Sequence, residues 1–541
     1  MLPALTELGN RLTQALAALR GQSPPPPVPP PVPLRRPHLA HLAQPDALLP
    51  DFVAQDAVAR KYLDLLGPLD WAHFPERPDN RPWPGPTPAP RAPYVAAYLI
   101  KLDAGLRSMG KLRTYLLEHP ALVWCLGFPL TADPTARHGF AVAQAVPTRR
   151  QFNRVLRDLD NAAVQFLLEG TVHLLKAALP PEQQAVFGDV IALDTKHILA
   201  WVKENNPKAY VDDRYDKTKQ PKGDPDCKLG CKKRHNQGEG DGEPAAAPPT
   251  TAAATPRPAT TPPTATATAA PAAPSPGAPA TNPKPAKPAA AGEYYWGYAS
   301  GVITTKVPDW GEFVLAEFTQ TFDHGDATYF FPLMQQVERR LGRRPRYGAL
   351  DKAYDAFYVY QYFHDAGGFA AVPFSEKGGL KTRSFSPEGL PLCAAGLPMP
   401  LKFTFTDRTS TLVVHERGKY ICPLHHNRAA PAATCPVNHD RWAHGGCTAM
   451  MPTCAGARIR YQLDRTSDQY QAIYKQRTAD ERSNSQAVEL GIERPRLRRQ
   501  SAIANQNTLI YVLINLRALQ RVRAHKEELA RQAKQPDAAG A

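Results

Sequence analysis

Residues 190–197 read Val-Ile-Ala-Leu-Asp-Thr-Lys-His, so a short apolar run leads directly into the carboxylate of Asp194. A run of this length and composition is typical of a strand that is buried in a sheet. A second run, Tyr-Gly-Ala-Leu at 347–350, leads into Asp351 in the same way. If both strands belong to one sheet, the two carboxylates lie at one edge of it. The alternative, which either acid alone leaves open, is an ordinary strand end or helix cap.

The segments around these two runs alternate between strand and helix patterns. β-branched and aromatic residues at 294–318 predict two or three further strands, and 368–374 predicts another. Apolar residues recur at helical spacing over 331–341 and 354–364. The sequence therefore predicts an α/β fold in which helices flank a mixed sheet.

A third acid stands on the helix that is predicted from Gln469 onward. Tyr474, Arg477 and Glu481 follow one another at offsets of three and four residues, so they share one helix face. Metal-dependent cleavage of a phosphodiester uses two Mg²⁺ ions about 4 Å apart, held by about three converging carboxylates. Glu481 would complete such a set with the two aspartates. The alternative is an exposed helix with a favourable charge pair.

Three motifs together resemble the DDE transposases of bacterial insertion sequences. Residues 474–481 read Tyr-Lys-Gln-Arg-Thr-Ala-Asp-Glu, which is similar to the Tyr-x2-Arg-x3-Glu signature of one large group in that family. Residues 190–197 are similar to the family's first acidic strand, and Leu-Asp-Lys-Ala-Tyr-Asp at 350–355 is similar to its second. The resemblance runs from about Ala96 to Arg521.

The resemblance implies an RNase H-like catalytic domain with a β-rich insertion before its last helix, and a helical N-terminal domain that helps to bind transposon ends. It implies that Asp194, Asp351 and Glu481 are the catalytic acids and the ligands of Mg²⁺ or Mn²⁺. Tyr474 and Arg477 are expected beside the DNA backbone, with Arg477 bound to a phosphate. The implied partners are transposon-end DNA and target DNA, and the joining of two ends implies at least a homodimer.

One position departs from the family's pattern. The family often has a lysine seven residues after the glutamate, where this chain has Val488. A nearby basic run is a candidate for the missing phosphate contact, and it contains Arg494, Arg496, Arg498 and Arg499. The departure weakens the assignment to this subgroup of the family more than it weakens the expected metal-dependent cleavage.

Charge and helical spacing indicate a nucleic-acid surface in the N-terminal part. The chain has 65 Lys and Arg against 50 Asp and Glu, a formal net charge of +15, which favours a polyanionic partner. Residues 94–180 have helical spacing, and the helix that begins after Thr148 carries Arg150 and Arg154 off its apolar stripe. We expect these two arginines to contact DNA phosphates. A solvated helix face is the alternative.

These patterns divide the chain into segments. The catalytic domain is expected in three pieces, 186–240, 293–390 and 466–525, after a helical DNA-binding domain at 35–185. The remaining segments are an N-terminal helix with a proline-rich spacer (1–34), an Ala/Pro/Thr-rich insertion expected to be disordered (241–292), a β-rich insertion with five of the eight cysteines (391–465) and a tail (526–541).

The cysteines raise the question of a structural metal. Cys227, Cys231 and His235 are spaced four residues apart, which would put three zinc-type ligands on one face of a helix. The cysteines of the β-rich insertion have irregular gaps that lack paired zinc-knuckle spacing. A structural Zn²⁺ ion stays open at both places, although small buried thiols without a metal are the favoured interpretation.

No apolar run approaches the roughly 20 residues that span a bilayer, and the N-terminus lacks the pattern of a secretory signal. We therefore expect no membrane partner and a cytoplasmic, nucleoid-associated protein. The expected function is that of an insertion-sequence transposase, which cleaves DNA at terminal inverted repeats and transfers the strand into target DNA. Two alternatives stay open: a transposase-derived DNA-binding protein without catalysis, and an RNase H-like nuclease without strand transfer.

Overall fold

The computed structural model describes residues 33–34, 49–76, 89–233, 292–375, 383–409, 411–426 and 434–534. The expected N-terminal helix, almost all of the proline-rich spacer and of the Ala/Pro/Thr-rich insertion, and His235 lie outside these residues. Two compact units are distinguished, one made of Met1–Leu229 with Trp296–Ala541 and the other of Gly230–Tyr295. The sites described below lie in the first unit. None of the helices in the described ranges is long and apolar enough to cross a membrane.

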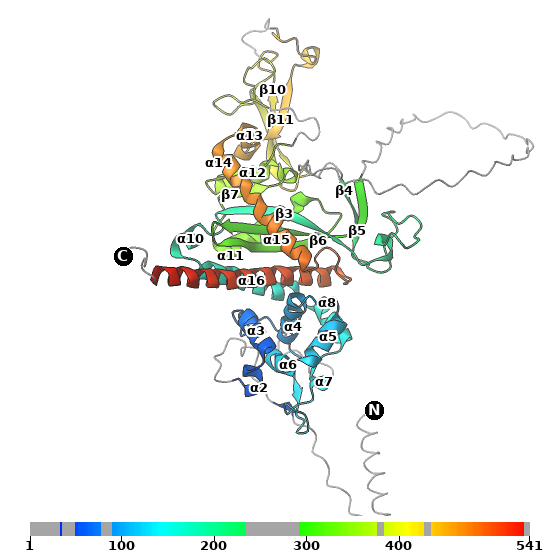
Figure 1. The fold of residues 1–541 in the computed structure, drawn as a ribbon. Helices are drawn as coiled ribbons and strands as arrows, with labels where there is room; N and C mark the ends of the chain where they lie inside the picture. Colours follow the sequence, from blue (N-terminus) through cyan, green and yellow to red (C-terminus); the bar gives the residue numbers. More distant parts are fainter. Residues whose placement is uncertain are drawn as a thin grey trace, which may run out of the picture. The chain divides into compact units, whose positions relative to one another are not determined.

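A mixed sheet forms the centre of the first unit (Figure 1). Its main strands are β3 (Val190–Leu199), β5 (Gly292–Val307), β6 (Gly311–Thr321), β7 (Tyr347–Leu350) and β8 (Phe369–Ala371). They lie side by side in the order β6-β5-β3-β7-β8, and β4 (Lys228–Lys233) also lies beside β5. β5 pairs antiparallel with β3 and β6, whereas β7 runs parallel to β3 and β8. The predicted mixed sheet is confirmed.

β3 extends beyond the point where the sequence predicts its end. The apolar pattern predicts an end at Asp194, and the pairing with β7 does stop there, at Leu193 opposite Leu350. The strand nevertheless continues, because β5 pairs with β3 from Ala192 through Leu199. Asp194 therefore lies inside a strand, where hydrogen bonding to β5 holds its backbone.

The described residues in 51–76 and 89–186 are mainly helical, as the spacing over 94–180 predicts. The helices are α2 (Asp51–Ala54), α3 (Ala57–Leu66), α4 (Ala92–Asp103), α5 (Met109–Glu118), α6 (Pro120–Leu126), α7 (Val142–Ala145), α8 (Arg149–Asp158), α9 (Asn161–Ala178) and α10 (Pro181–Val186), and the short strands β1 (Pro33–Leu34) and β2 (Leu130–Thr131) pair with each other. α8 begins at a capping box in which Gln151 accepts the Thr148 backbone N–H at 2.7 Å. It buries Phe152 and Leu156 and leaves its arginines exposed.

Helices flank the sheet, which confirms the second part of the predicted fold class. α11 (Phe330–Leu341) connects β6 to β7, and α12 (Phe357–Asp365) connects β7 to β8. The long α16 (Gln500–Lys534) contacts β6 and also α9, α8 and α4. In Figure 1 it runs between the sheet and the helices α3 to α8. α16 and α9, which both contact β6, therefore join the helical segment to the sheet.

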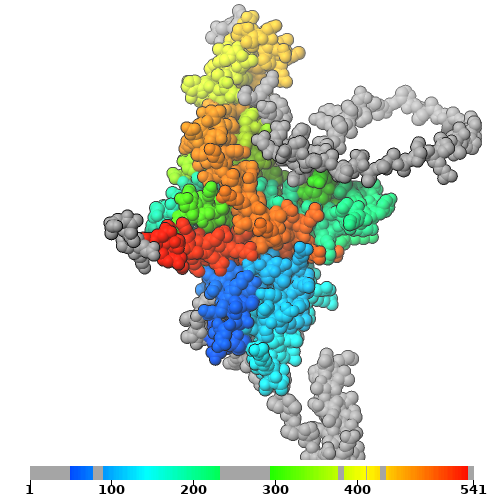
Figure 2. Space-filling view, viewed as in Figure 1, coloured from blue at the N-terminus to red at the C-terminus, as the bar shows by residue number. Residues whose placement is uncertain are grey.

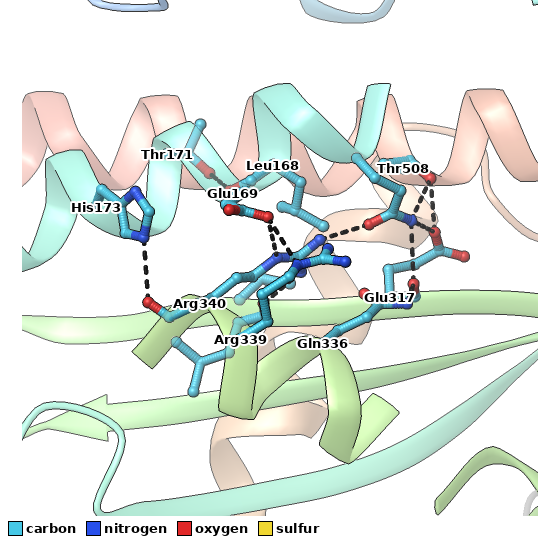
Figure 3. Close-up of polar contacts among 12 residues, drawn as sticks. Leu168, Glu169, Thr171, His173, Glu317, Gln336, Arg339, Arg340 and Thr508 are labelled. Carbon is cyan, nitrogen blue, oxygen red and sulfur yellow. Dashed lines mark hydrogen bonds and ion pairs between the residues drawn. The ribbon is translucent and has the colours of Figure 1, made fainter. Parts of the chain in front are cut away.

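A buried polar network fixes α16 in this position (Figure 3). Glu317 on β6 is 1% exposed and accepts hydrogen bonds from Thr508 on α16 at 2.6 Å and from Gln165 on α9 at 3.3 Å. Arg340 on α11 donates to Gln165 at 2.7 Å and to the carbonyl oxygen of Leu315 at 2.6 Å. Because these buried groups bond across four elements, loss of one leaves partners on the others unsatisfied.

The segment between β8 and the C-terminal helices contains a small antiparallel sheet, as the β-rich pattern predicts. Its order is β11-β10-β9, with bounds Leu401–Asp407 for β9, His415–Ile421 for β10 and Thr448–Pro452 for β11. α13 (Ala455–Gln462) follows and packs on α12. The small sheet and α13 share an apolar core, which contains Met399, Tyr420, Ala449, Met451 and Ala457.

Candidate active site

The sheet register brings the two strand acids together. Leu193 on β3 lies opposite Leu350 on the parallel strand β7, and Asp194 and Asp351 are the next residues along these strands. Neighbouring strands lie about 4.8 Å apart, so the two side chains start from adjacent positions. Asp351 also accepts a hydrogen bond from the N–H of the following residue, which fixes its carboxylate at the strand end.

The helical stretch that carries the third acid begins at Ser467 but is not a single helix. It comprises α14 (Asp468–Tyr474), a 3-10 turn (Lys475–Arg477) and α15 (Thr478–Glu489). Ser467 caps α14 by accepting the Tyr470 N–H at 3.3 Å. α14 contacts β7, and both the turn and α15 contact β3. The stretch therefore crosses the two strands that carry the aspartates.

Two contacts indicate where Glu481 lies relative to Asp194 and Asp351. Arg477 donates from Nη2 to Oε1 of Glu481 at 2.7 Å. Asn484, which is 7% exposed, donates to Oδ2 of Asp194 at 3.0 Å. Residues three apart share a helix face, so Glu481 lies toward the face of α15 that meets Asp194. Glu481 is itself exposed, and α14 and α15 form part of the surface in Figure 2.

The electrostatics of the cluster are dominated by burial and by excess negative charge. Burial raises the pKa of Asp194, and the carboxylates of Asp351 and Asp326 raise it further. The Thr195 N–H, which donates to Asp194 at 2.8 Å, and the Arg477 guanidinium lower the same pKa. Several partly buried carboxylates beside one arginine form an environment that a divalent cation stabilises.

Tyr474 stands in the same cluster as the acids. Burial raises the pKa of its phenol, the positive charge of Arg477 lowers it, and the charge of Asp351 raises it again. Its ring stacks on Tyr470 with centroids 5.8 Å apart and an interplanar angle of 15°. The tyrosine and the arginine of the predicted motif therefore lie beside the candidate metal ligands.

Sequence reasoning missed two further acids at the site. Asp326, in the 3-10 helix Asp326–Tyr329, accepts a hydrogen bond from the Thr195 hydroxyl at 3.0 Å. Asp480 is fully buried and accepts a hydrogen bond from Thr304 on β5. Burial, followed by the charge of Asp194, raises the pKa of Asp480 well above its ordinary value. Only Asp480 gave a signal in the sequence, since it adjoins Glu481.

The donor set is of the kind that suits a hard divalent cation, since Mg²⁺ and Mn²⁺ prefer carboxylate oxygens. Within the described ranges, however, no three His, Cys, Asp or Glu side chains are already gathered in a metal-binding arrangement. Glu481 is instead paired with Arg477. A three-acid site therefore requires a turn of this exposed side chain toward Asp194 and Asp351.

The remaining residues predicted to contact DNA lie on the surface. Arg150 and Arg154 are exposed on α8. Val488, at the position where the family often has lysine, is 37% exposed on α15. In the basic run that follows, Arg496 and Arg498 are exposed as well.

Cys227 and Cys231 do not lie on a helix, so the zinc-type spacing does not place them on one helix face, and His235 lies outside the described residues. Residues 228–233 form β4, because pairing with β5 prevails over the local spacing. Cys227 is buried and its Sγ donates to the carbonyl oxygen of Asp224 at 3.3 Å. Burial raises the pKa of this thiol to about 12.

Apolar packing accounts for several cysteines of the β-rich insertion. Cys393, Cys447 and Cys454 pack against the core around Met399 and Tyr420. Burial, followed by the neighbouring thiol of Cys422, raises the pKa of Cys447 to about 12. Packing in the apolar core is therefore one role of these thiols.

Comparison of the chain with protein-family models, with curated proteins and with solved structures gives no match.

Proposed function

We propose that the protein is a DDE transposase of an insertion sequence, with an RNase H-like catalytic domain that cleaves DNA at terminal inverted repeats and joins it to target DNA. One observation carries the proposal. The register of β3 and β7 sets Asp194 beside Asp351, and Asn484 ties the helix of Glu481 to Asp194 at 3.0 Å. Two acids from distant parts of the chain are thus neighbours, and the helix of the third packs against them, which supports two-metal chemistry once Glu481 turns toward the pair.

The coarse architecture supports the same proposal. The sheet has an antiparallel and a parallel part, and the first two acids come from its parallel pair β3 and β7. A β-rich segment stands between β8 and α14, before the helix of the third acid. This is the order of elements that the sequence resemblance implies.

In this proposal the chain's own side chains hold the metal ions and the scissile phosphate. Asp194, Asp351 and Glu481 would bind Mg²⁺ or Mn²⁺, which when bound neutralises charge on the attacking and leaving oxygens. Arg477 exchanges its bond with Glu481 for a phosphate oxygen of the DNA, a ligand that suits the guanidinium fork. Asn484 keeps the Asp194 carboxylate oriented. Because two transposon ends are joined, the active species is at least a dimer.

The test is cleavage of DNA that carries the flanking terminal inverted repeats, with Mg²⁺ or Mn²⁺. Asp194→Asn, Asp351→Asn and Glu481→Gln should each lower the cleavage rate by roughly 10³-fold or more, which is ~4 kcal/mol of lost transition-state stabilisation. DNA binding in EDTA should persist in all three. Glu489→Gln, an exposed acid on the same helix as Glu481, is the matched control and should cleave normally.

The outcomes separate the proposal from its alternatives. Cleavage that survives all three substitutions would remove the site assignment. Binding without cleavage under either metal indicates a DNA-binding protein that has lost catalysis. Cleavage without any joined product indicates an RNase H-like nuclease.

A further inference from the structure

The helical segment, the loop after β3 and the residues before α16 enclose a strongly basic cavity, which we call the basic groove. Its volume is about 660 Å³, and of its 17 lining residues eight are Lys or Arg and none is Asp or Glu. Single basic side chains are ordinary surface features. Two of the eight are paired with acids outside the wall, Arg157 with Asp158 at 2.8 Å and Arg499 with Asp226 at 3.4 Å. The remaining positive charge around one cavity, with no acid in its wall, favours a bound polyanion.

Separate parts of the chain supply these charges. α4 and the turn after it supply Lys101 and Arg107, and the residues before α16 supply Arg496, Arg498 and Arg499. The four arginines are exposed. Burial lowers the pKa of Lys101 to about 8, so a phosphate bound beside it would favour its charged form. The groove is thus assembled by the tertiary structure and not by one basic run.

α8 turns one of its faces into the groove. Arg149, Asn153 and Arg157 line the cavity, and their spacing of four residues puts them on a single helix face. Arg150 and Arg154, the arginines singled out from the sequence, are exposed on the same helix but do not line the cavity. All four arginines are exposed, but only Arg149 and Arg157 face the cavity.

The wall before α16 is held from behind by two acids. Asp224 is buried and accepts the Arg499 N–H at 3.1 Å, and Asp226 accepts the Gln500 N–H at 3.0 Å. Arg499 has a φ of 80°, in the left-handed region that residues with a Cβ rarely adopt. The surrounding hydrogen bonds hold this unfavourable turn, which fixes the position of the arginines around it.

Trp201 gives the groove a flat aromatic surface. Its side chain is 52% exposed, and the Arg498 guanidinium lies 5.0 Å from the centroid of its ring. An exposed indole next to cations is suited to stack on a nucleobase while the cations bind the adjoining phosphates.

The groove adjoins the elements that carry the candidate catalytic acids. β3 carries Asp194 and leads to Trp201, and α15 carries Glu481 and leads to Arg496. At about 3.3 Å per strand residue, the distance from Asp194 to Leu199 is roughly 17 Å, or about five steps along a DNA strand. Trp201 follows Leu199 by two residues, so a strand bound at Trp201 lies several nucleotides from the acids.

We propose that the basic groove binds the phosphodiester backbone of the DNA substrate several nucleotides from the cleavage point, with a base stacked on Trp201. This inference rests on the proposed transposase function, because it assigns DNA as the ligand of a surface adjoining that site. Eight cations exceed the charge of any single phosphate group, and the indole favours a ligand with bases. Both features favour a nucleic-acid strand over a small anion.

The test measures binding of a fluorescently labelled duplex by anisotropy over a salt series, in EDTA so that no cleavage occurs. Arg149→Gln with Arg496→Gln should weaken binding by about 10- to 100-fold and reduce the slope of log K against log salt by about 2, one phosphate for each charge. Arg521→Gln with Arg523→Gln, two exposed arginines of α16 that do not line the cavity, is the matched control and should change neither quantity. Urea unfolding of both double variants checks that the fold is unchanged.

A second arm tests the stacking. Trp201→Ala should weaken binding of a duplex with a single-stranded overhang by about tenfold more than binding of the blunt duplex, and Trp201→Phe should restore most of the loss. Equal losses for both duplexes would overturn the stacking role of Trp201.

Equal affinities and equal salt slopes for the groove pair and the control pair would overturn the groove assignment. So would single-stranded RNA that competes better than DNA of the same sequence, or a wild-type protein that binds no DNA. Because binding is measured without metal, a groove that fails while cleavage still depends on Asp194 leaves the proposed function standing. If the groove binds DNA but the protein cleaves none, the groove assignment stands and the proposed function fails.

Discussion

Glu317 offers a test of how α16 is fixed to the sheet. The carboxylate is 1% exposed. Its Oε1 accepts hydrogen bonds from Ser300 at 3.0 Å and from Thr319, and its Oε2 accepts from Thr508 at 2.6 Å and from Gln165 at 3.3 Å. Glu317→Ala removes the acceptor of four donors, whereas Glu317→Gln keeps the shape and one carbonyl oxygen.

The magnitude follows from these contacts. A buried donor that loses its acceptor costs about 1–3 kcal/mol, but hydroxyl groups rotate and recover part of this energy. With about 1 kcal/mol added for the cavity, we expect Glu317→Ala to lower the free energy of unfolding by about 3–5 kcal/mol. Glu317→Gln should cost about 1 kcal/mol, because its amide replaces one acceptor by a donor that Thr508 can satisfy.

The pH dependence has a definite sign. Burial raises the pKa of Glu317, against the lowering effect of its hydrogen bonds. Above the unfolded pKa, the folded state therefore holds a proton that the unfolded state releases. The associated stability is fully present below the unfolded pKa and is lost as pH rises through the folded pKa, by at most about 1.4 kcal/mol per pH unit. The stability of Glu317→Gln does not fall in this way, because glutamine does not titrate.

Urea unfolding followed by circular dichroism, repeated between about pH 5 and pH 8, measures both effects. The wild type should lose stability relative to Glu317→Gln as pH rises. Glu489→Gln, an exposed acid on α15, is the control and should stay parallel to the wild type. Equal stabilities of Glu317→Ala and Glu317→Gln, or a pH-independent gap between wild type and Glu317→Gln, would refute the reasoning.

Three further changes test other contacts. Asp355→Asn takes the charge partner from Arg460, bonded at 2.7 Å in a nearly buried pair, and should cost about 3–4 kcal/mol in urea unfolding. Gly456→Ala puts a Cβ 2.2 Å from a backbone oxygen of α12 and should lower stability by about 2–3 kcal/mol in the same assay. Asn484→Ala frees the Asp194 carboxylate and should lower cleavage by about 10- to 100-fold while binding in EDTA is unchanged.

The changes at Gly456 and Asn484 each have a control on a helix. Gly170→Ala on α9, where a Cβ meets nothing within 4 Å, should not destabilise the protein. Ser485→Ala, an exposed neighbour of Asn484, should cleave normally. A stable Gly456→Ala protein would show that α12 and α13 are not in close contact, and normal cleavage by Asn484→Ala would remove its orienting role.

Local pattern was enough to predict most elements of the first unit. The apolar runs before Asp194 and Asp351 are strands, and the helical spacing after 330 and after Ser467 gives helices. Alternation and 3.6-residue periodicity arise from interactions between residues close in sequence, so they can be read without the tertiary structure. The same holds for two of the three candidate acids, since a carboxylate directly after a buried apolar run stands out.

The tertiary structure alone decided which side chains meet. Pairing with β5 carries β3 past Asp194 to Leu199 and turns the segment after Cys227 into a strand instead of a helix. The same long-range packing brings Asp326 and Asn484 to the acids. The lining of the basic groove by Arg149 and Arg157, and not by Arg150 and Arg154, likewise depends on how α8 packs. Register and packing join residues far apart in the chain, and no local pattern specifies which of them will be neighbours.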